Sequence, residues 1–166
     1  MLISSCTNKE NKIYEGKYIR ECADQENADP VEFVIDLLRK ERMKVNIIGF
    51  AMNEDNLKSV LKAPFVMIGS DGCAVAPYGK LAQGKPHPRY YGSFPRVLGK
   101  YCRDEKIFDL ATAIRKMTSM PAEKLGLDKR GEIRKNYFAD ITIFNPETVI
   151  DRATFVDPHQ YAAGIE

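Results

Sequence analysis

The sequence predicts an α/β fold in which amphipathic helices cover a parallel sheet. Helical patterns at residues 30–42 and after Asn53 alternate with two short apolar runs, Val45–Phe50 and Phe65–Ile68. Continuous apolar strands that alternate with amphipathic helices are typical of parallel sheets with both faces covered. Because a sheet of two strands is too small to be stable alone, we expect this chain to be part of a larger structure.

The two helices have recognisable start signals. Asp29 followed by Pro30 is an N-cap with proline at the first helical position. Five apolar residues then recur at helical spacing: Val31, Phe33, Val34, Leu37 and Leu38. Asn53 can cap the second helix, and we expect its inner face to carry Leu57, Val60 and Leu61.

The rest of the chain is less regular. Residues 1–28 are polar and show no apolar period, and residues 73–96 are rich in Gly and Pro, so both are predicted to be irregular. Further helices are expected at Phe94–Arg103 and at Leu110–Ser119, with Asp109 capping the second and a turn at Pro121–Leu125. Short strands are expected at Gly131–Ile133 and Ala139–Phe144.

Composition restricts the class of protein. Hydrophobic residues make up 44% of the chain and charged residues 29%, as in ordinary globular domains. The formal net charge of +2 argues against charge-driven binding of nucleic acid. No apolar run approaches the roughly 20 residues of a membrane helix, and the N-terminus lacks a signal-peptide pattern. We therefore expect a cytoplasmic protein whose four scattered cysteines are reduced: Cys6, Cys22, Cys73 and Cys102.

Asp71 is the first candidate for chemistry. It follows the apolar run Phe65–Ile68, and carboxyl ends of parallel strands are where α/β folds build active sites. Gly69 and Gly72 beside it permit sharp turns and close approach of a ligand. An aspartate here can bind a metal or take a proton from metal-bound water. Spacing alone leaves open a structural alternative, a loop carboxylate that accepts hydrogen bonds from nearby backbone N–H groups.

The loop Lys85–Arg89 is the second candidate. Its two prolines stiffen the backbone and restrict where His87 and Arg89 point. The planar guanidinium of Arg89 suits a substrate carboxylate, although an exposed arginine beside a structural histidine fits the pattern as well. His87 and His159 are the only histidines and are too few for a zinc site with three histidine ligands.

Several stretches resemble the N-acyl-D-amino-acid deacylases (D-aminoacylases) of the amidohydrolase superfamily. The most specific similarity runs from residue 66 to residue 101 and includes Val66–Gly72, Gly84–Arg89 and Tyr91–Tyr101. Further similar stretches lie at Ala113–Ser119, Arg130–Gly131, Ala139–Asp140 and Asp151–Tyr161. The resemblance extends over essentially the whole chain from Ile3.

The resemblance implies a fold and a cofactor. The chain would be the C-terminal portion of a metal-dependent (β/α)8 barrel, with the start of the return strands of a small β-sandwich. Residues 1–128 would hold the end of the barrel, including its last strand and active-site loop, and residues 129–166 would return to the β-sandwich. The whole enzymes of this family carry Zn²⁺.

The resemblance also assigns roles to residues. Asp71 would be the general base and acid, taking a proton from zinc-activated water and passing it to the leaving amine nitrogen. Arg89 would bind the α-carboxylate of an N-acyl-D-amino acid. Met52 would line the pocket for the substrate side chain, and His87 would orient groups beside the site.

Departures from the family pattern limit these expectations. The family's HxH pair, bridging cysteine and further histidines have no counterpart in this chain, and Asp71 is the one possible metal ligand. We therefore expect the isolated chain to bind no catalytic zinc and to be inactive. Cys73 stands where small or apolar residues are usual, and Asn136 replaces a glycine, a mild change because asparagine tolerates left-handed backbone.

Other functions remain open at this point. A related amidohydrolase that acts on cyclic amides is one, although Arg89 favours an open-chain substrate with a free carboxylate. A deacylase specific for D-glutamate or D-aspartate derivatives is another. A non-catalytic remnant or interaction module is the third. Expected partners are the N-acyl-D-amino acid, a missing N-terminal half, or a second copy bound through unpaired barrel edges.

Overall fold

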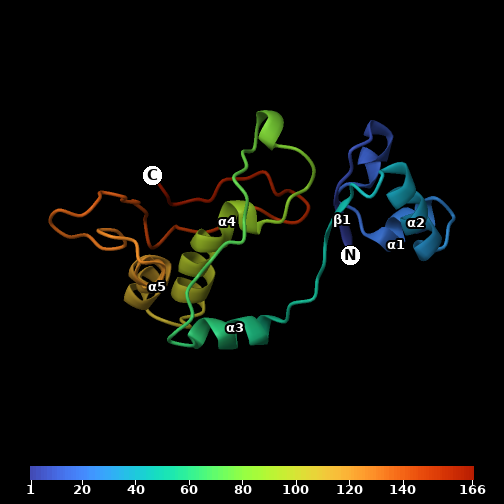
Figure 1. Ribbon diagram of the computed structural model, residues 1–166. Coiled ribbons are helices and arrows are strands. Elements are labelled where there is room, and N and C mark those ends of the chain that lie inside the picture. Colours follow the sequence, from blue (N-terminus) through green and yellow to red (C-terminus); the bar gives the residue numbers. More distant parts are fainter. The chain divides into compact units, whose positions relative to one another are not determined.

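The computed structural model describes residues 1–166, which divide into two units with separate apolar cores. Figure 1 shows the chain, with β1 and helices α1 to α5 labelled. Unit 1 comprises residues 1–51, 74–90 and 153–160, and unit 2 comprises residues 52–73, 91–152 and 161–166. The predicted boundary at residues 128 and 129, between barrel and β-sandwich segments, stays a prediction.

Unit 1 contains a two-stranded sheet and two α-helices. Strand β1 (Leu2–Ser5) pairs antiparallel with β2 (Asn46–Ile48), with Ile3 opposite Ile47. Between them in sequence lie η1 (Lys9–Tyr14), α1 (Ile19–Gln25) and α2 (Pro30–Lys40), and η2 (Gly79–Leu81) follows later in the chain. The core of the unit consists of seven buried residues: Ile3, Cys6, Tyr14, Cys22, Ala23, Phe33 and Leu37.

The predicted start of α2 is confirmed. The Asp29 carboxylate accepts hydrogen bonds from the backbone N–H groups of Val31 (2.8 Å) and Glu32 (3.3 Å), and Pro30 opens the helix. Phe33 and Leu37 are buried, whereas Val31 is exposed. The helix ends at Lys40 rather than at the predicted residue 42.

Glu41, directly after α2, organises the start of the chain. Its buried carboxylate accepts hydrogen bonds from the backbone N–H groups of Thr7 (2.6 Å) and Asn8 (3.1 Å) and from the Asn11 side chain. Burial alone would raise the pKa of Glu41, but these hydrogen bonds outweigh it and lower the pKa below 4.5.

Unit 2 is helical. It contains α3 (Glu54–Lys62), the π-helix η3 (Val97–Asp104), α5 (Leu110–Met117) and α6 (Ser119–Leu125). Helix α4 (Arg89–Arg96) begins at the end of unit 1 and runs into η3. Asn53 and Asp109 accept backbone hydrogen bonds at the starts of α3 and α5, as predicted.

Two glycines allow residues 149–151 to pack closely against the consecutive helices α4 and η3. A Cβ atom at Gly92 would stand 2.5 Å from the Cβ of Asp151, and one at Gly99 would collide with the carbonyl oxygen of Val149. Val149 is fully buried beside Leu98 and Ala113 in one of the two cores of this unit. The glycines therefore act through close packing rather than through special backbone angles.

The predicted parallel sheet is not what the chain forms. The only sheet is antiparallel, because β1, in the region 1–28 that was predicted to be irregular, supplies the partner of β2. Within the predicted strand Val45–Phe50, only Asn46–Ile48 pairs, and Ile47 and Phe50 are exposed. The prediction for residues 1–28 was wrong because the run Leu2–Ser5 is only four residues long and half polar.

The run Phe65–Ile68 forms no strand, contrary to prediction. No strand of this chain lies beside it, and an extended segment without a ladder partner has no regular set of backbone hydrogen bonds. Phe65 is 78% exposed.

Two other predictions need correction. Helix formation starts at Arg89, five residues before the predicted Phe94, and Val60 points outward although it was expected on the inner face of α3. The predicted strands at Gly131–Ile133 and Ala139–Phe144 are absent; Phe144 alone forms a bridge, with Ile165.

Candidate functional site

Asp71 lies in unit 2, on the exposed segment that follows α3. Its backbone is left-handed, with φ of 47°. The backbone N–H of Gly72 donates a hydrogen bond to the Ser70 hydroxyl at 3.2 Å, so the turn closes around Asp71. Aspartate tolerates this conformation better than most residues. A carboxylate is a side chain that can take up and release a proton near neutral pH, so the chemistry of Asp71 suits proton transfer.

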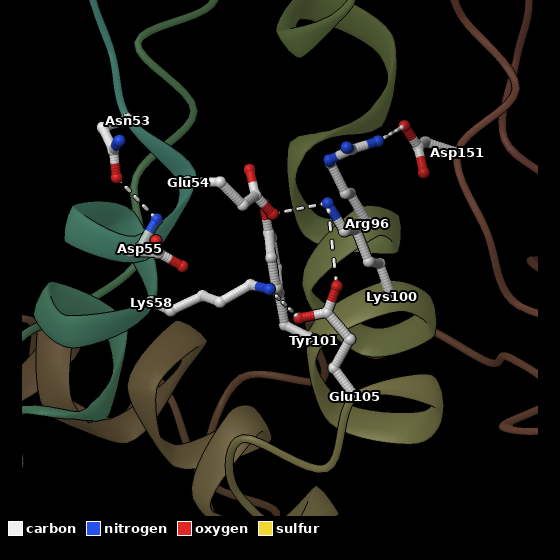
Figure 2. A network of polar contacts seen from close by, with 9 residues as sticks. All are labelled: Asn53, Glu54, Asp55, Lys58, Arg96, Lys100, Tyr101, Glu105 and Asp151. Atoms are coloured by element: carbon white, nitrogen blue, oxygen red, sulfur yellow. Dashed lines mark hydrogen bonds and ion pairs between the residues drawn. The ribbon is translucent and has the colours of Figure 1, made fainter.

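Helix α3, which leads to this segment, is fixed to η3 by charged side chains (Figure 2). The Glu54 carboxylate accepts hydrogen bonds from Lys100 Nζ at 2.5 Å and from the Tyr101 hydroxyl at 3.1 Å. Lys58 pairs with Glu105 at 3.0 Å. The bonds from Lys100 and Tyr101 lower the pKa of Glu54, and burial opposes this only in part. These contacts join the start and the middle of α3 to η3 and to Glu105 directly after it.

Arg96 and Asp151 form a further charged pair in Figure 2. Arg96 Nη1 lies 2.9 Å from Asp151 Oδ2, and the Asp151 side chain is only 9% exposed. Asp151 also contacts Gly92, so this pair fixes the C-terminal segment against α4. Its role is structural.

His87 and Arg89 lie together in unit 1, both half-buried. The backbone N–H of Arg89 donates a hydrogen bond to His87 Nδ1 at 3.0 Å. Burial, and then the charge of Arg89, lower the pKa of His87, which favours the neutral ring that this acceptor role needs. The predicted role of His87 as an orienting group beside the site stays a prediction.

The loop carrying these residues is fastened to residues 155–159, which we call the C-terminal strap. The His159 ring bonds the carbonyl oxygen of Gly84 at 2.9 Å, and Lys85 Nζ donates to the carbonyl oxygen of Val156 at 3.1 Å. The Phe155 ring meets the His87 ring edge-on at a centroid distance of 5.0 Å. Three contacts therefore hold the loop at its start and its middle.

Strand β1 holds the same loop from another element. The backbone N–H of Lys85 donates to the carbonyl oxygen of Ser4 at 2.6 Å, and the Ser4 hydroxyl donates to the carbonyl oxygen of Lys85 at 2.8 Å. Phe155 also contacts Phe50, just after β2, at 4.9 Å between ring centroids. Arg89 thus lies at the end of a loop that other parts of unit 1 hold from two directions.

The four predicted site residues fall into two pairs. His87 and Arg89 are brought together in unit 1, whereas Asp71 and Met52 belong to unit 2. Met52 is 81% exposed just before α3, and its role in lining a pocket stays a prediction. The roles of Asp71, Arg89 and His87 also remain predictions.

The residues of this chain do not fit a zinc site on their own. Nowhere do three or more His, Cys, Asp or Glu side chains gather as metal ligands. Cys6 is buried, and burial together with Glu41 raises its pKa to about 11, which disfavours the thiolate that binds metal. Separately, none of the helices is long and apolar enough to cross a membrane.

Sequence reasoning missed two groups that support the candidate residues. Phe155 gives no signal in the sequence, because its ring contacts depend on a fold that brings residues 50, 87 and 155 together. Lys116 lies within a helical pattern next to Arg115, where a charged residue is expected to be solvated, yet it is among the most buried side chains. A lysine between Ile114 and Met117 was the available hint.

Comparison with known proteins identifies the family. The model of the amidohydrolase family matches residues 7–166. The chain belongs to the amidohydrolase family. A D-aminoacylase of Alcaligenes xylosoxydans xylosoxydans is 45% identical over 125 residues, which are 75% of this chain and 24% of that enzyme. An N-acyl-D-glutamate deacylase of the same organism is 40% identical over 119 residues, 72% of this chain and 23% of the relative.

Solved structures give the same result. An N-acyl-D-glutamate deacylase from Bordetella bronchiseptica, complexed with zinc and a phosphonate that mimics the tetrahedral intermediate, matches with a TM-score of 0.86 and 34% identity. A D-aminoacylase structure matches with a TM-score of 0.83 and 38% identity. Each match covers 99% of this chain and 32% of the solved chain. The resemblance to D-aminoacylases is therefore confirmed, and this chain spans about a quarter of the length of its curated relatives.

Proposed function

We propose that this chain forms part of an enzyme that hydrolyses N-acyl-D-amino acids to a D-amino acid and a carboxylate. The observation that carries the proposal is that the similar curated proteins and solved structures are deacylases of this class. In this proposal residues 1–128 belong to the C-terminal part of the (β/α)8 barrel and residues 129–166 return to the β-sandwich.

Asp71 is the proton-transfer group of the proposed reaction. Its carboxylate takes a proton from the attacking water as the C–O bond forms, and returns it to the amide nitrogen as the C–N bond breaks. The exposed turn closed by Ser70 and Gly72 supports the proposal, since it leaves the carboxylate near the surface of its unit. Because the chain gathers no metal ligands, this role is argued for the carboxylate alone.

Arg89 is the proposed anchor for the substrate α-carboxylate. A guanidinium binds a carboxylate through two parallel N–H donors, which fixes its orientation as well as its position. The hydrogen bond to His87 and the C-terminal strap support this role, because they restrain the backbone from which Arg89 extends. Met52 is proposed to face the substrate side chain.

The proposal is tested by grafting this chain in place of the matching segment of the A. xylosoxydans D-aminoacylase. We expect the graft to deacylate N-acetyl-D-methionine and not the L enantiomer, with the parent enzyme as control. Comparing D-methionine, D-glutamate and D-aspartate derivatives then establishes side-chain preference. A folded, zinc-loaded graft that hydrolyses only hydantoins or dihydropyrimidines, or nothing, would contradict the proposal.

The isolated chain provides the complementary measurement. We expect no deacylation and no stoichiometric zinc when the 166-residue chain is assayed with added zinc. Bound zinc together with turnover that Asp71→Asn abolishes would overturn this expectation.

A further inference from the structure

Lys116 is a buried lysine in α5, and its ammonium group forms hydrogen bonds within unit 2. The residue is 2% exposed. Its Nζ donates hydrogen bonds to the carbonyl oxygens of Ala63 at 2.5 Å and Val66 at 2.9 Å. Lysines are almost never fully buried unless they are paired, so a lysine held by backbone carbonyls points to a specific task.

The backbone of the same residue contacts the same segment. The N–H of Ile68 donates a hydrogen bond to the carbonyl oxygen of Lys116 at 3.1 Å. Three hydrogen bonds from one residue therefore fasten positions 63, 66 and 68. Asp71 follows only three residues after the last of them.

The position of the ammonium group also suits its charge. Ala63 is the C-cap residue of α3, and a cation is favourable near the carbonyl end of a helix. Burial, and then the charge of Arg115, lower the pKa of Lys116. The carbonyl oxygens provide the partners that the buried group requires.

Within the segment itself, the N–H of Val66 donates a hydrogen bond to the carbonyl oxygen of Ala63 at 3.2 Å. The segment has no strand partner, and its first apolar residue, Phe65, is exposed. Ile68 packs against the cluster of Leu61, Val97 and Tyr101 and adds an apolar contact. The hydrogen bonds of Lys116 are the ones that connect this segment to α5.

We propose that Lys116 is a positioning residue for Asp71: its ammonium and carbonyl groups fix residues 63–68 and so set where the carboxylate stands. We call the hydrogen bonds of Lys116 to residues 63, 66 and 68 the Lys116 clamp. The relevance of this clamp to catalysis rests on the proposed function of Asp71, whereas its existence does not. Lys116 touches neither substrate nor reacting atoms in this proposal.

The test uses the isotope-labelled 166-residue chain and three variants, without substrate or metal. Lys116→Met removes the ammonium, and Lys116→Arg keeps a cation with several donors. Lys58→Met is the matched control, because Lys58 pairs with Glu105 in the same unit but makes no bond to residues 63–68. Amide exchange at Ile68 and the heteronuclear NOE at Ser70–Gly72 are measured by NMR.

We expect Lys116→Met to speed exchange at Ile68 by at least about 10-fold, as for the loss of hydrogen bonds to a charged group. The NOE at Asp71 should fall, the Ala113 amide in α5 should be unchanged, and Lys116→Arg should restore much of the protection. Unchanged Ile68 exchange in a folded Lys116→Met chain overturns the clamp. Faster exchange at Ile68 with an unchanged NOE at Asp71 overturns the positioning role, as does an equal effect of Lys58→Met.

A second measurement covers the case in which Lys116→Met fails to fold. In the unmodified chain, amine acetylation should reach Lys116 more slowly than exposed lysines, by roughly 10-fold or more, because acetylation needs local opening that exposes the buried ammonium group. Acetylation of Lys116 at the rate of an exposed lysine overturns the proposal. Because neither measurement uses substrate, a failed deacylation assay and a failed clamp are distinguishable.

Discussion

Among single residues, Arg89 offers the most direct test of substrate recognition. Arg89→Lys keeps the charge but removes the planar pair of donors, so carboxylate binding should weaken more than chemistry. In the grafted D-aminoacylase we expect KM for N-acetyl-D-methionine to rise roughly 10-fold with a much smaller change in kcat. A fall in kcat alone would place Arg89 outside the carboxylate site. Lys80→Met, which removes an exposed charge on η2, is the control.

Glu41 gives a residue-scale prediction about stability and pH. Its pKa is lowered in the folded chain, so its stabilising effect is fully present above the ordinary value of 4.5 and is lost as pH falls through the folded pKa. Glu41→Gln should lower the stability of unit 1 at pH 7 by about 1 kcal/mol, because it weakens charge-assisted bonds to Thr7 and Asn8.

The measurement is urea unfolding of both proteins at pH 7 and below pH 4.5, followed at unit 1 amides. The difference between Glu41→Gln and the parent chain should shrink at the lower pH as the parent carboxylate becomes protonated. A difference that is constant or grows on acidification would show that the Glu41 charge does not contribute.

At the scale of elements, the C-terminal strap is predicted to restrain the Arg89 loop. Phe155→Ala removes the ring contacts with His87 and Phe50. Because such contacts contribute about 1 kcal/mol, amide exchange across residues 84–89 should accelerate roughly 5-fold. Val156→Ala is a matched control, since the Val156 side chain is 75% exposed and its carbonyl oxygen, which binds Lys85, is retained. Equal exchange in the two variants would exclude the bracing role of the ring.

Three helix starts with side-chain caps were predictable from sequence, whereas only one of the predicted strands, at Val45–Phe50, formed in part. Asp29, Asn53 and Asp109 each accept backbone hydrogen bonds at a predicted helix start, because capping is a local interaction between neighbouring residues. Strand formation in Phe65–Ile68 and Ala139–Phe144 depends on partners distant in sequence, and those runs remain unpaired apart from the Phe144 bridge. The run Leu2–Ser5 was not predicted to be a strand but forms one, because its partner β2 is over 40 residues away in sequence.

In the candidate site, too, local features were predictable and contacts between distant segments were not. Asp71 and the His87–Arg89 pair were found through short motifs, which are local features of the chain. Their supports, Lys116 and Phe155, were missed because each acts on a segment far from it in sequence, at positions 63–68 and 87 respectively. Contacts of that kind follow from the tertiary fold and leave no periodic signal.

At the scale of the whole molecule, the chain consists of two units, and each carries residues that we propose to be functional. Unit 1 holds Arg89 on a braced loop, and unit 2 holds Asp71 on a segment fastened by Lys116. Because the chain spans about a quarter of its curated relatives, the complete catalytic centre is expected to need residues from the rest of such an enzyme.

The most direct test of this account is the kcat of the grafted D-aminoacylase carrying Asp71→Asn. A proton-transfer group contributes roughly 100-fold or more to rate, so we predict a loss of that size with folding and zinc content unchanged. Asp55→Asn, which alters an exposed carboxylate at the start of α3, should leave kcat within about twofold. If Asp71→Asn retains the kcat of the unsubstituted graft, Asp71 is not the proton-transfer group and the central claim is wrong.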